Sequence, residues 1–181
     1  MNELTWDEVE RNGKTISFRM PEPKDGAAVN KLIAECPPLD RNSVYCNILQ
    51  CDLFADTSVI AEVDDRVIGF VSAMLDPRET TSLFVWQIVV HPDMQGHGLA
   101  EKLLDELMLR PPCRMITHIQ CTINPSNKAS WALFERFAKR LHTSLEAKQG
   151  YPASYFGGGT EDETRIVIGP LATPDHADYD Q

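Results

Sequence analysis

The clearest chemical signal in the sequence lies in residues 88–100, which read Ile-Val-Val-His-Pro-Asp-Met-Gln-Gly-His-Gly-Leu-Ala. An apolar run ends there, a loop with two glycines follows, and a helical pattern begins at once. Glycine lets a ligand approach the backbone closely, and the first N–H groups of a helix have no partner within it. The helix dipole adds about half a positive charge at this end. The segment therefore predicts a backbone cradle for phosphate, with a plain strand-to-helix turn as the alternative.

The composition limits the partners of such a site. The 181 residues include 17 Lys and Arg against 27 Asp and Glu, which gives a net charge of −10 and a pI near 4.9. Nucleic acids and anionic membranes attract clustered basic charge, so we expect neither as a partner. A small cationic ligand suits the balance better. No apolar run approaches the ~20 residues of a membrane span, and the first residues do not resemble a signal peptide.

The cysteines and histidines point to no metal. The 5 cysteines form no CxxC pair, and the 5 histidines show no metal-ligand spacing. Thiols without such pairing are typical of a reducing compartment. We therefore expect reduced thiols, a cytoplasmic protein and no metal ion.

Apolar periodicity divides the chain into alternating strands and helices. The expected fold class is α/β, with one domain over residues 15–170 between a flexible segment 1–14 and a flexible acidic tail 171–181. The strand at residues 82–90 is apolar on both faces, so we expect it to be buried on both sides. The expected strands are 15–20, 58–63, 66–75, 82–90, 115–121, 143–148 and 164–168, and the expected helices are 24–36, 42–55 (capped by Asn42), 100–109 and 127–141.

The loop also carries a family signature. Gln95-Gly96-His97-Gly98-Leu99-Ala100 fits the pattern Q/R-x-x-G-x-G/A, and residues 16–169 resemble the GCN5-related N-acetyltransferase (GNAT) superfamily. The resemblance implies a GNAT fold: a mixed central sheet of about six to seven strands, splayed by a bulge and flanked by about four helices. It also implies acetyl-CoA as co-substrate, with its pyrophosphate on the backbone of residues 95–100. The implied cofactor contacts are Ile88, Val89, Val90, Gln95, Gly96, His97, Gly98, Leu99, Ala100 and Asn127.

A narrower resemblance is carried by residues 38–46, 84–87 and 123–130, which are similar to the diaminobutyrate acetyltransferases. It implies acetyl transfer to the γ-amino group of L-2,4-diaminobutyrate, giving N4-acetyl-2,4-diaminobutyrate in the synthesis of the osmoprotectant ectoine. It also implies a cytoplasmic homodimer. Two alternatives stay open: an acetyltransferase for another polyamine or a protein N-terminus, and a silent acetyl-CoA-binding module.

Acetyl transfer needs an oxyanion donor, a group that takes the proton of the amine, and residues that orient the substrate. We expect the backbone N–H of Ile88 to stabilise the oxyanion and Glu161 to serve the amine. The expected substrate-binding residues are Asp40, Tyr45, Trp86, Asn124 and Glu163. Some of these residues have a purely structural alternative: core packing for Trp86, and a helix cap or a turn for Asp40. For Glu161 and Glu163 the alternative is an exposed charged loop.

Two positions depart from the family pattern. Trp86 and Gln87 stand where many members carry a Glu base, and Phe134 replaces the tyrosine that donates to the leaving thiolate. Tyr151 and Tyr155 are possible replacement donors. These departures leave the route of the proton open and keep the silent module under consideration.

Overall fold

A computed structural model describes residues 9–11, 14–37, 39, 41–157 and 161–172 of the chain. These residues form four α-helices and eight strands, and they group into two compact units. The first unit holds Met1–Met74 and Gln87–Pro111, and the second holds Leu75–Trp86 and Pro112–Gln181. Strand β5 (Glu79–Val90) passes through both, because the division falls between Trp86 and Gln87.

The first unit is built on antiparallel neighbours. Its strands are β1 (Val9–Arg11), β2 (Lys14–Arg19), β3 (Ser58–Val63) and β4 (Arg66–Asp76), each paired with the next. The turn between β3 and β4 consists of Asp64 and Asp65, both with positive φ, 49° and 60°. A type I′ two-residue turn requires positive φ at both positions, which Asp tolerates, so these two residues join the predicted strands 58–63 and 66–75 as a hairpin.

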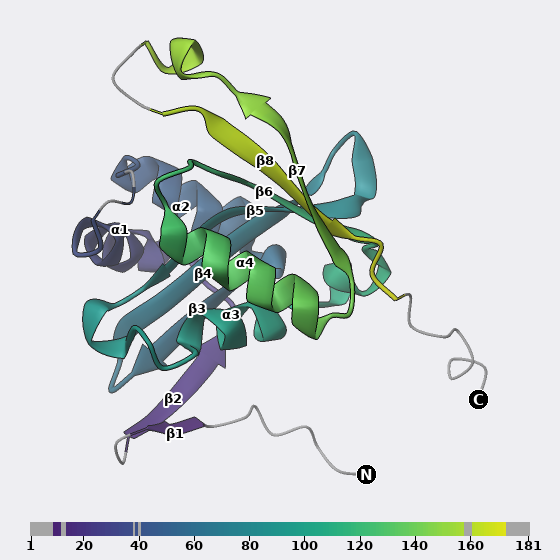
Figure 1. Cartoon of the computed structure of the whole chain (residues 1–181). Coiled ribbons are helices and arrows are strands. Elements are labelled where there is room, and N and C mark those ends of the chain that lie inside the picture. The colour runs from purple at the N-terminus through teal and green to yellow at the C-terminus, as the bar shows by residue number, and fades with distance from the viewer. Residues whose placement is uncertain (1–8, 12–13, 38, 40, 158–160, 173–181) are drawn as a thin grey trace, which may run out of the picture. The chain divides into compact units, whose positions relative to one another are not determined.

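Helices α1 (Gly26–Ala34) and α2 (Val44–Leu53) lie side by side (Figure 1) and pack on one face of these strands. The apolar spacing of the first helix places its buried residues on one stripe, toward the strands. Removing this apolar surface from water is the main force that holds the two helices to the strands. The shared core consists of Val29, Leu32, Ile33, Cys36, Cys51, Ile60, Phe70 and Val89.

Helix α3 (Leu99–Met108) covers the opposite face of the same strands. Successive side chains alternate between the faces of a strand, so Ala61 and Gly69 face away from the core under α1 and α2. A Cβ placed on Gly69 would lie 3.0 Å from Leu103 of α3 and 3.3 Å from Ala61. This close packing fixes the start of α3 against the sheet, and with it the loop that precedes the helix.

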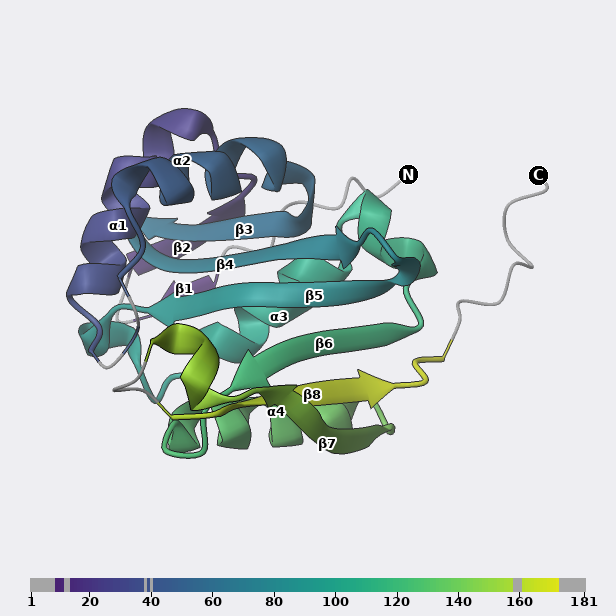
Figure 2. The ribbon, with the colours of Figure 1, turned by 90° about the horizontal axis from the view of Figure 1, so that it is seen from above.

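The second unit orders its strands β5-β6-β8-β7. Strand β6 (His118–Ile123) is parallel to β5, β8 (Glu163–Gly169) is antiparallel to β6, and β7 (Ser144–Tyr151) is antiparallel to β8. Figure 2 shows α4 (Lys128–Arg140) running along β6, β8 and β7. The buried side chains between helix and strands are Ile119, Cys121, Ile123, Leu133, Phe134, Phe137, Ala138, Ile166 and Ile168.

The sequence predicted the order of the elements correctly but missed several boundaries. Val9–Arg11 forms a strand inside the segment predicted to be flexible, which brings the number of described strands above the predicted six to seven. Strand β6 starts at His118 rather than residue 115, because Pro111–Met115 forms a 3-10 turn. Residues 1–8 and 173–181 lie outside the described residues. No helix in the described part of the chain is long and apolar enough to span a membrane.

Two further predictions about local structure were wrong. Ser43, not Asn42, caps α2, because its Oγ accepts the N–H of Cys46 at 3.1 Å. Strand β5 is not buried on both sides: Leu83 and Val85 are buried, whereas Trp86 is 46% exposed. Apolar residue types alone could not distinguish a core position from an exposed aromatic one.

Candidate active site

The junction between β5 and α3 has the backbone shape that a phosphate cradle requires. Gly96 and Gly98 adopt left-handed φ values of 74° and 79°, which side chains rarely take. Gly98 is the N-cap of α3 and makes no side-chain cap, so no side chain of its own competes with a ligand for the first N–H groups of the helix. A Cβ at Gly96 would meet nothing within 4 Å, and the loop is exposed. The junction therefore fits a pyrophosphate.

Hydrogen bonds from both sides fix this loop to the end of β5. The Gln95 side chain donates from Nε2 to the carbonyl of Val90 at 3.0 Å, and Cys36 Sγ donates to the same carbonyl at 3.4 Å. The N–H of His91 donates to the carbonyl of Ile68 in β4 at 2.8 Å. Gln95 and the carbonyl of Val90 thus hold the loop in shape, a role that the sequence did not reveal.

The other predicted cofactor contacts of the first unit differ in what their side chains do. Val89 and Leu99 are buried in the core, so only their backbone can meet a ligand. His97 is exposed in the loop, and Ala100 is half-buried in the first turn of α3. Ile88, half-buried on β5, alternates with Val89 and therefore faces away from the Val89 core.

In the second unit, Ser126 connects two predicted site residues. Its N–H donates to Glu161 Oε2 at 3.0 Å, and its hydroxyl donates to Asn124 Oδ1 at 3.5 Å. Asn127 caps α4, because its Oδ1 accepts the N–H of Ser130 at 3.1 Å. The structure thus gathers Asn124, Asn127 and Glu161 at the N-terminus of α4. The sequence reading missed Ser126, although it lies between two residues that were singled out.

The remaining predicted substrate residues are distributed over both units. Trp86 is 46% exposed on β5, which excludes core packing as its role, and Glu163 is half-buried at the start of β8. Tyr45 is 68% exposed in the first turn of α2. Asp40 lies outside the described residues.

The comparisons with known proteins agree with this geometry. The model of the acetyltransferase (GNAT) family matches residues 27–138, which include the loop and α3. The chain belongs to the GNAT acetyltransferase family. Curated relatives include the L-2,4-diaminobutyric acid acetyltransferase of Methylotuvimicrobium alcaliphilum, 42% identical over 157 residues, 86% of this chain and 91% of the relative. That of Halalkalibacterium halodurans is 40% identical over 158 residues, 87% of this chain and 83% of the relative.

A solved GNAT structure is similar over nearly the whole chain. It is the diaminobutyrate acetyltransferase EctA from Paenibacillus lautus in complex with its substrate L-2,4-diaminobutyric acid and coenzyme A. The two share 39% identity with a TM-score of 0.86, covering 90% of this chain and 99% of the other. The prediction of a GNAT fold is therefore confirmed, and acetyl-CoA is the co-substrate of this family.

The replacement of the usual GNAT tyrosine by Phe134 leaves an apolar side chain at this position. Phe134, at the position of the usual tyrosine, is 2% exposed and packs in the core under α4, with no group that could donate a proton. Tyr155 is 76% exposed, and the hydroxyl of Tyr151 accepts a hydrogen bond from Arg165 Nη2 at 3.1 Å.

Gln87, at the position of the usual GNAT base, belongs to a network of side-chain amides. Its Oε1 accepts from Asn42 Nδ2 at 3.3 Å. Asn30 Nδ2 donates to the Asn42 carbonyl and to Asn47 Oδ1, both at 2.8 Å, and Asn47 Nδ2 donates to Gln50 Oε1 at 2.9 Å. The network ties β5 to α1 and to the segment before α2. The network could have been predicted from the sequence, because Asn47 and Gln50 are polar residues on the buried face of a helix.

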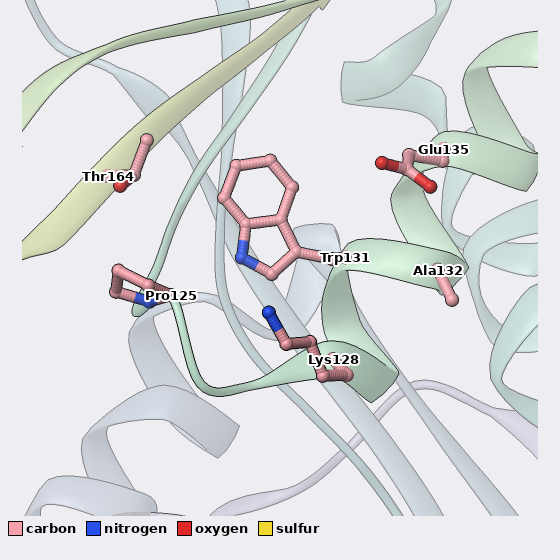
Figure 3. Close-up of a pocket in the computed structure, with 6 residues that line it drawn as sticks. All are labelled: Pro125, Lys128, Trp131, Ala132, Glu135 and Thr164. Atoms are coloured by element: carbon pink, nitrogen blue, oxygen red, sulfur yellow. The ribbon is translucent and has the colours of Figure 1, made fainter.

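A hollow of about 450 Å³ lies on the α4 side of the second unit, and none of the predicted site residues lines it. Figure 3 shows the indole of Trp131 at its centre, between Thr164 of β8 and Lys128 and Glu135 of α4. Trp131 Nε1 donates to the carbonyl of Asn124 at 3.2 Å, so this indole supports the turn that carries Asn124. Within the described residues, no cluster of three or more His, Cys, Asp or Glu could hold a metal ion.

Proposed function

We propose that this chain transfers the acetyl group of acetyl-CoA to the γ-amino group of L-2,4-diaminobutyrate, giving N4-acetyl-2,4-diaminobutyrate, a step of ectoine biosynthesis. The observation that carries the proposal is the similarity over 90% of the chain to an acetyltransferase solved with that substrate and coenzyme A. The glycine loop before α3, with two left-handed residues and no capping side chain, supports the cofactor half of the proposal.

The cofactor residues would bind and orient acetyl-CoA, which supplies the acetyl thioester. The N–H groups at residues 95–100 would hold the pyrophosphate through the helix terminus. The backbone N–H of Ile88 would stabilise the negative charge that develops on the thioester oxygen. Asn127 caps α4. From the family resemblance we expect this end of the helix to lie near the cofactor, and the cap would hold it in place.

The amine must lose a proton before it can attack. An amine with a pKa of about 10.4 is only about one part in a thousand neutral near pH 7.4, equivalent to roughly 4 kcal/mol. Glu161 is exposed at the N-terminus of α4, where a substrate ammonium could reach its carboxylate, and Ser126 fixes one of its oxygens. We assign it to orient the ammonium and to receive the proton, directly or through water.

A thiol-release assay with acetyl-CoA tests the substrate. L-2,4-diaminobutyrate should outperform lysine and putrescine, and NMR should locate the acetyl group on the γ-nitrogen. Putrescine leaves donors for the carboxylate unpaired, and lysine places its amine two methylenes further from the thioester. Equal rates on all three amines would refute the assignment of diaminobutyrate as the substrate, but not the acetyltransferase activity. Coenzyme A binding without turnover of any amine would instead identify a silent module.

The role of Glu161 is tested by Glu161→Gln, because the amide oxygen can still accept the N–H of Ser126 while the charge is lost. We expect kcat/KM to fall on the order of 10²-fold. Glu163→Gln is the matched variant and should lower it less. If Glu161→Gln keeps wild-type kcat/KM over a pH series while Asp40→Asn abolishes it, the segment before α2 holds the amine instead.

The assembly and compartment are part of the same proposal. A homodimer in the cytoplasm follows from the resemblance to diaminobutyrate acetyltransferases. Light scattering coupled to size exclusion should give about twice the chain mass of 20.3 kDa. A monomer at assay concentration would refute the dimer without affecting the chemistry.

A further inference from the structure

The sheet of the second unit has two unlike faces. Leu83, Ile119 and Ile166 belong to the buried face under α4. The alternate residues form the other face, which is aromatic and polar. In register, Phe84 lies opposite Gln120, and Thr122 lies opposite Arg165. Figure 2 shows these strands side by side.

The candidate substrate residues of this unit lie on the same face as Arg165. Trp86 is two residues beyond Phe84 on β5, and Glu163 is two residues before Arg165 on β8, so alternation puts all four on one face. Neighbouring strands are about 4.8 Å apart, which places β8 about 10 Å from β5 across β6. An arginine side chain can cover much of that distance, and Arg165 does so: its guanidinium carbon lies 5.9 Å from the centre of the Phe84 ring.

The guanidinium of Arg165 is held in place by uncharged groups. Nη1 donates to Gln120 Oε1 at 2.8 Å, and Gln120 Nε2 donates in turn to the buried Ser82 Oγ at 2.6 Å. Nη2 donates to the Tyr151 hydroxyl at 3.1 Å, and the Tyr151 ring centre lies 5.7 Å away. The cation is therefore fixed in orientation while its charge is not neutralised by either hydrogen-bond acceptor.

The fixed guanidinium has donor capacity beyond these two bonds. A guanidinium carries five N–H groups, and two parallel ones match the oxygens of a carboxylate. The nearby Asp76 forms its ion pair with Arg78 at 3.1 Å. Hydrogen bonds from Arg78 lower the pKa of Asp76, and the nearby charge of Arg165 lowers it further.

We infer that Arg165 binds the α-carboxylate of the amino-acid substrate and thereby selects diamino acids over simple diamines. The inference rests on the proposed function, since it concerns the same substrate. It supplies a cationic partner for the carboxylate of diaminobutyrate, which the ionised acidic candidates cannot bind. Lys148, directly opposite Arg165 on β7, is 55% exposed and pairs with Glu146 at 3.2 Å, so it is not oriented in this way.

The test compares two substrates that differ only in the carboxylate: L-2,4-diaminobutyrate and 1,3-diaminopropane. Arg165→Met should lower kcat/KM for diaminobutyrate by about 10²-fold, mainly through KM, and change that for 1,3-diaminopropane less than threefold. Arg165→Lys keeps the charge but loses the bidentate geometry, so its kcat/KM for diaminobutyrate should lie between those of the wild type and Arg165→Met. Lys148→Met is the matched control and should keep the wild-type preference.

Each outcome decides the matter. If Arg165→Met lowers both substrates equally, or if the preference for diaminobutyrate survives, Arg165 does not bind the carboxylate and only this inference is overturned. If the wild type itself shows no preference for diaminobutyrate, the proposed function fails as well. Should Arg165→Met not fold, Arg165→Gln replaces it, because its side chain is polar and uncharged, and the substrate ratio is read in the same way.

Discussion

The cofactor loop gives the sharpest prediction, because one side chain at Gly98 should abolish acetyl-CoA binding and leave the fold intact. In Gly98→Val a β-branched side chain would stand at the N-cap of α3, where phosphate oxygens would approach the first N–H groups of the helix. It would also have to adopt a φ of 79°. The variant therefore combines a loss of binding with a cost in backbone strain, and the two effects must be separated.

The strain can be estimated. A left-handed conformation costs a non-glycine residue roughly 1–2 kcal/mol. In a chain of this size each kcal/mol lowers Tm by about 2–4 °C, so Gly98→Val should melt about 2–8 °C below the wild type. Typical domains have about 5–15 kcal/mol of stability, so the variant should remain folded. Loss of the phosphate contacts should weaken coenzyme A binding at least 100-fold, equivalent to about 2.8 kcal/mol.

Isothermal titration with coenzyme A measures the affinity, and circular dichroism measures folding and Tm. Gly157→Val is the matched control: its φ is 76°, close to that of Gly98, its Cβ would meet nothing within 4 Å, and it lies at the end of a short turn in the second unit. It should show a similar fall in Tm with coenzyme A affinity unchanged. If Gly98→Val binds coenzyme A as the wild type does, the loop is an ordinary turn and the cradle is refuted.

Two further predictions follow from buried groups of the first unit. Burial opposes ionisation of Asp25, but hydrogen bonds from Arg19 and from the N–H of Glu22 lower its pKa overall. The ion pair of Asp25 with Arg19 therefore stabilises the fold fully above pH 4, and this stability is lost as the pH falls through the lowered pKa of the folded state. Asp25→Asn should cost about 1–3 kcal/mol of stability at pH 7 and make Tm depend less on pH in the acid range. An unchanged dependence of Tm on acid pH would contradict this. Burial raises the pKa of the Cys51 thiol to about 12, while Cys46 on the same helix is half-exposed, so iodoacetamide at pH 8 should alkylate Cys46 at least tenfold faster by peptide mass spectrometry. Equal labelling would mean that α2 opens readily.

Local features of the chain could be predicted from sequence because neighbouring residues determine them. The Asp64-Asp65 turn, the start of α4 at Asn127 and the glycine loop before α3 each depend on a few adjacent residues with specific backbone preferences. The alternation of strands and helices followed from apolar spacing in the same way. These signals, with the family signature, were sufficient for the fold and the cofactor class, and the phosphate cradle stays a prediction.

The arrangement of side chains within the candidate site depended on contacts between distant residues. Asn42 meets Gln87 and Arg165 meets Gln120 across 45 residues each, and the N–H of Ser126 meets Glu161 across 35. Strand register and helix packing decide these pairs, and a shift of one residue would turn each strand side chain to the opposite face. The sequence therefore named Asn42 as a helix cap and left Arg165 unnoticed. Only the tertiary structure gives that cation a fixed orientation, because the groups that hold it come from three other strands.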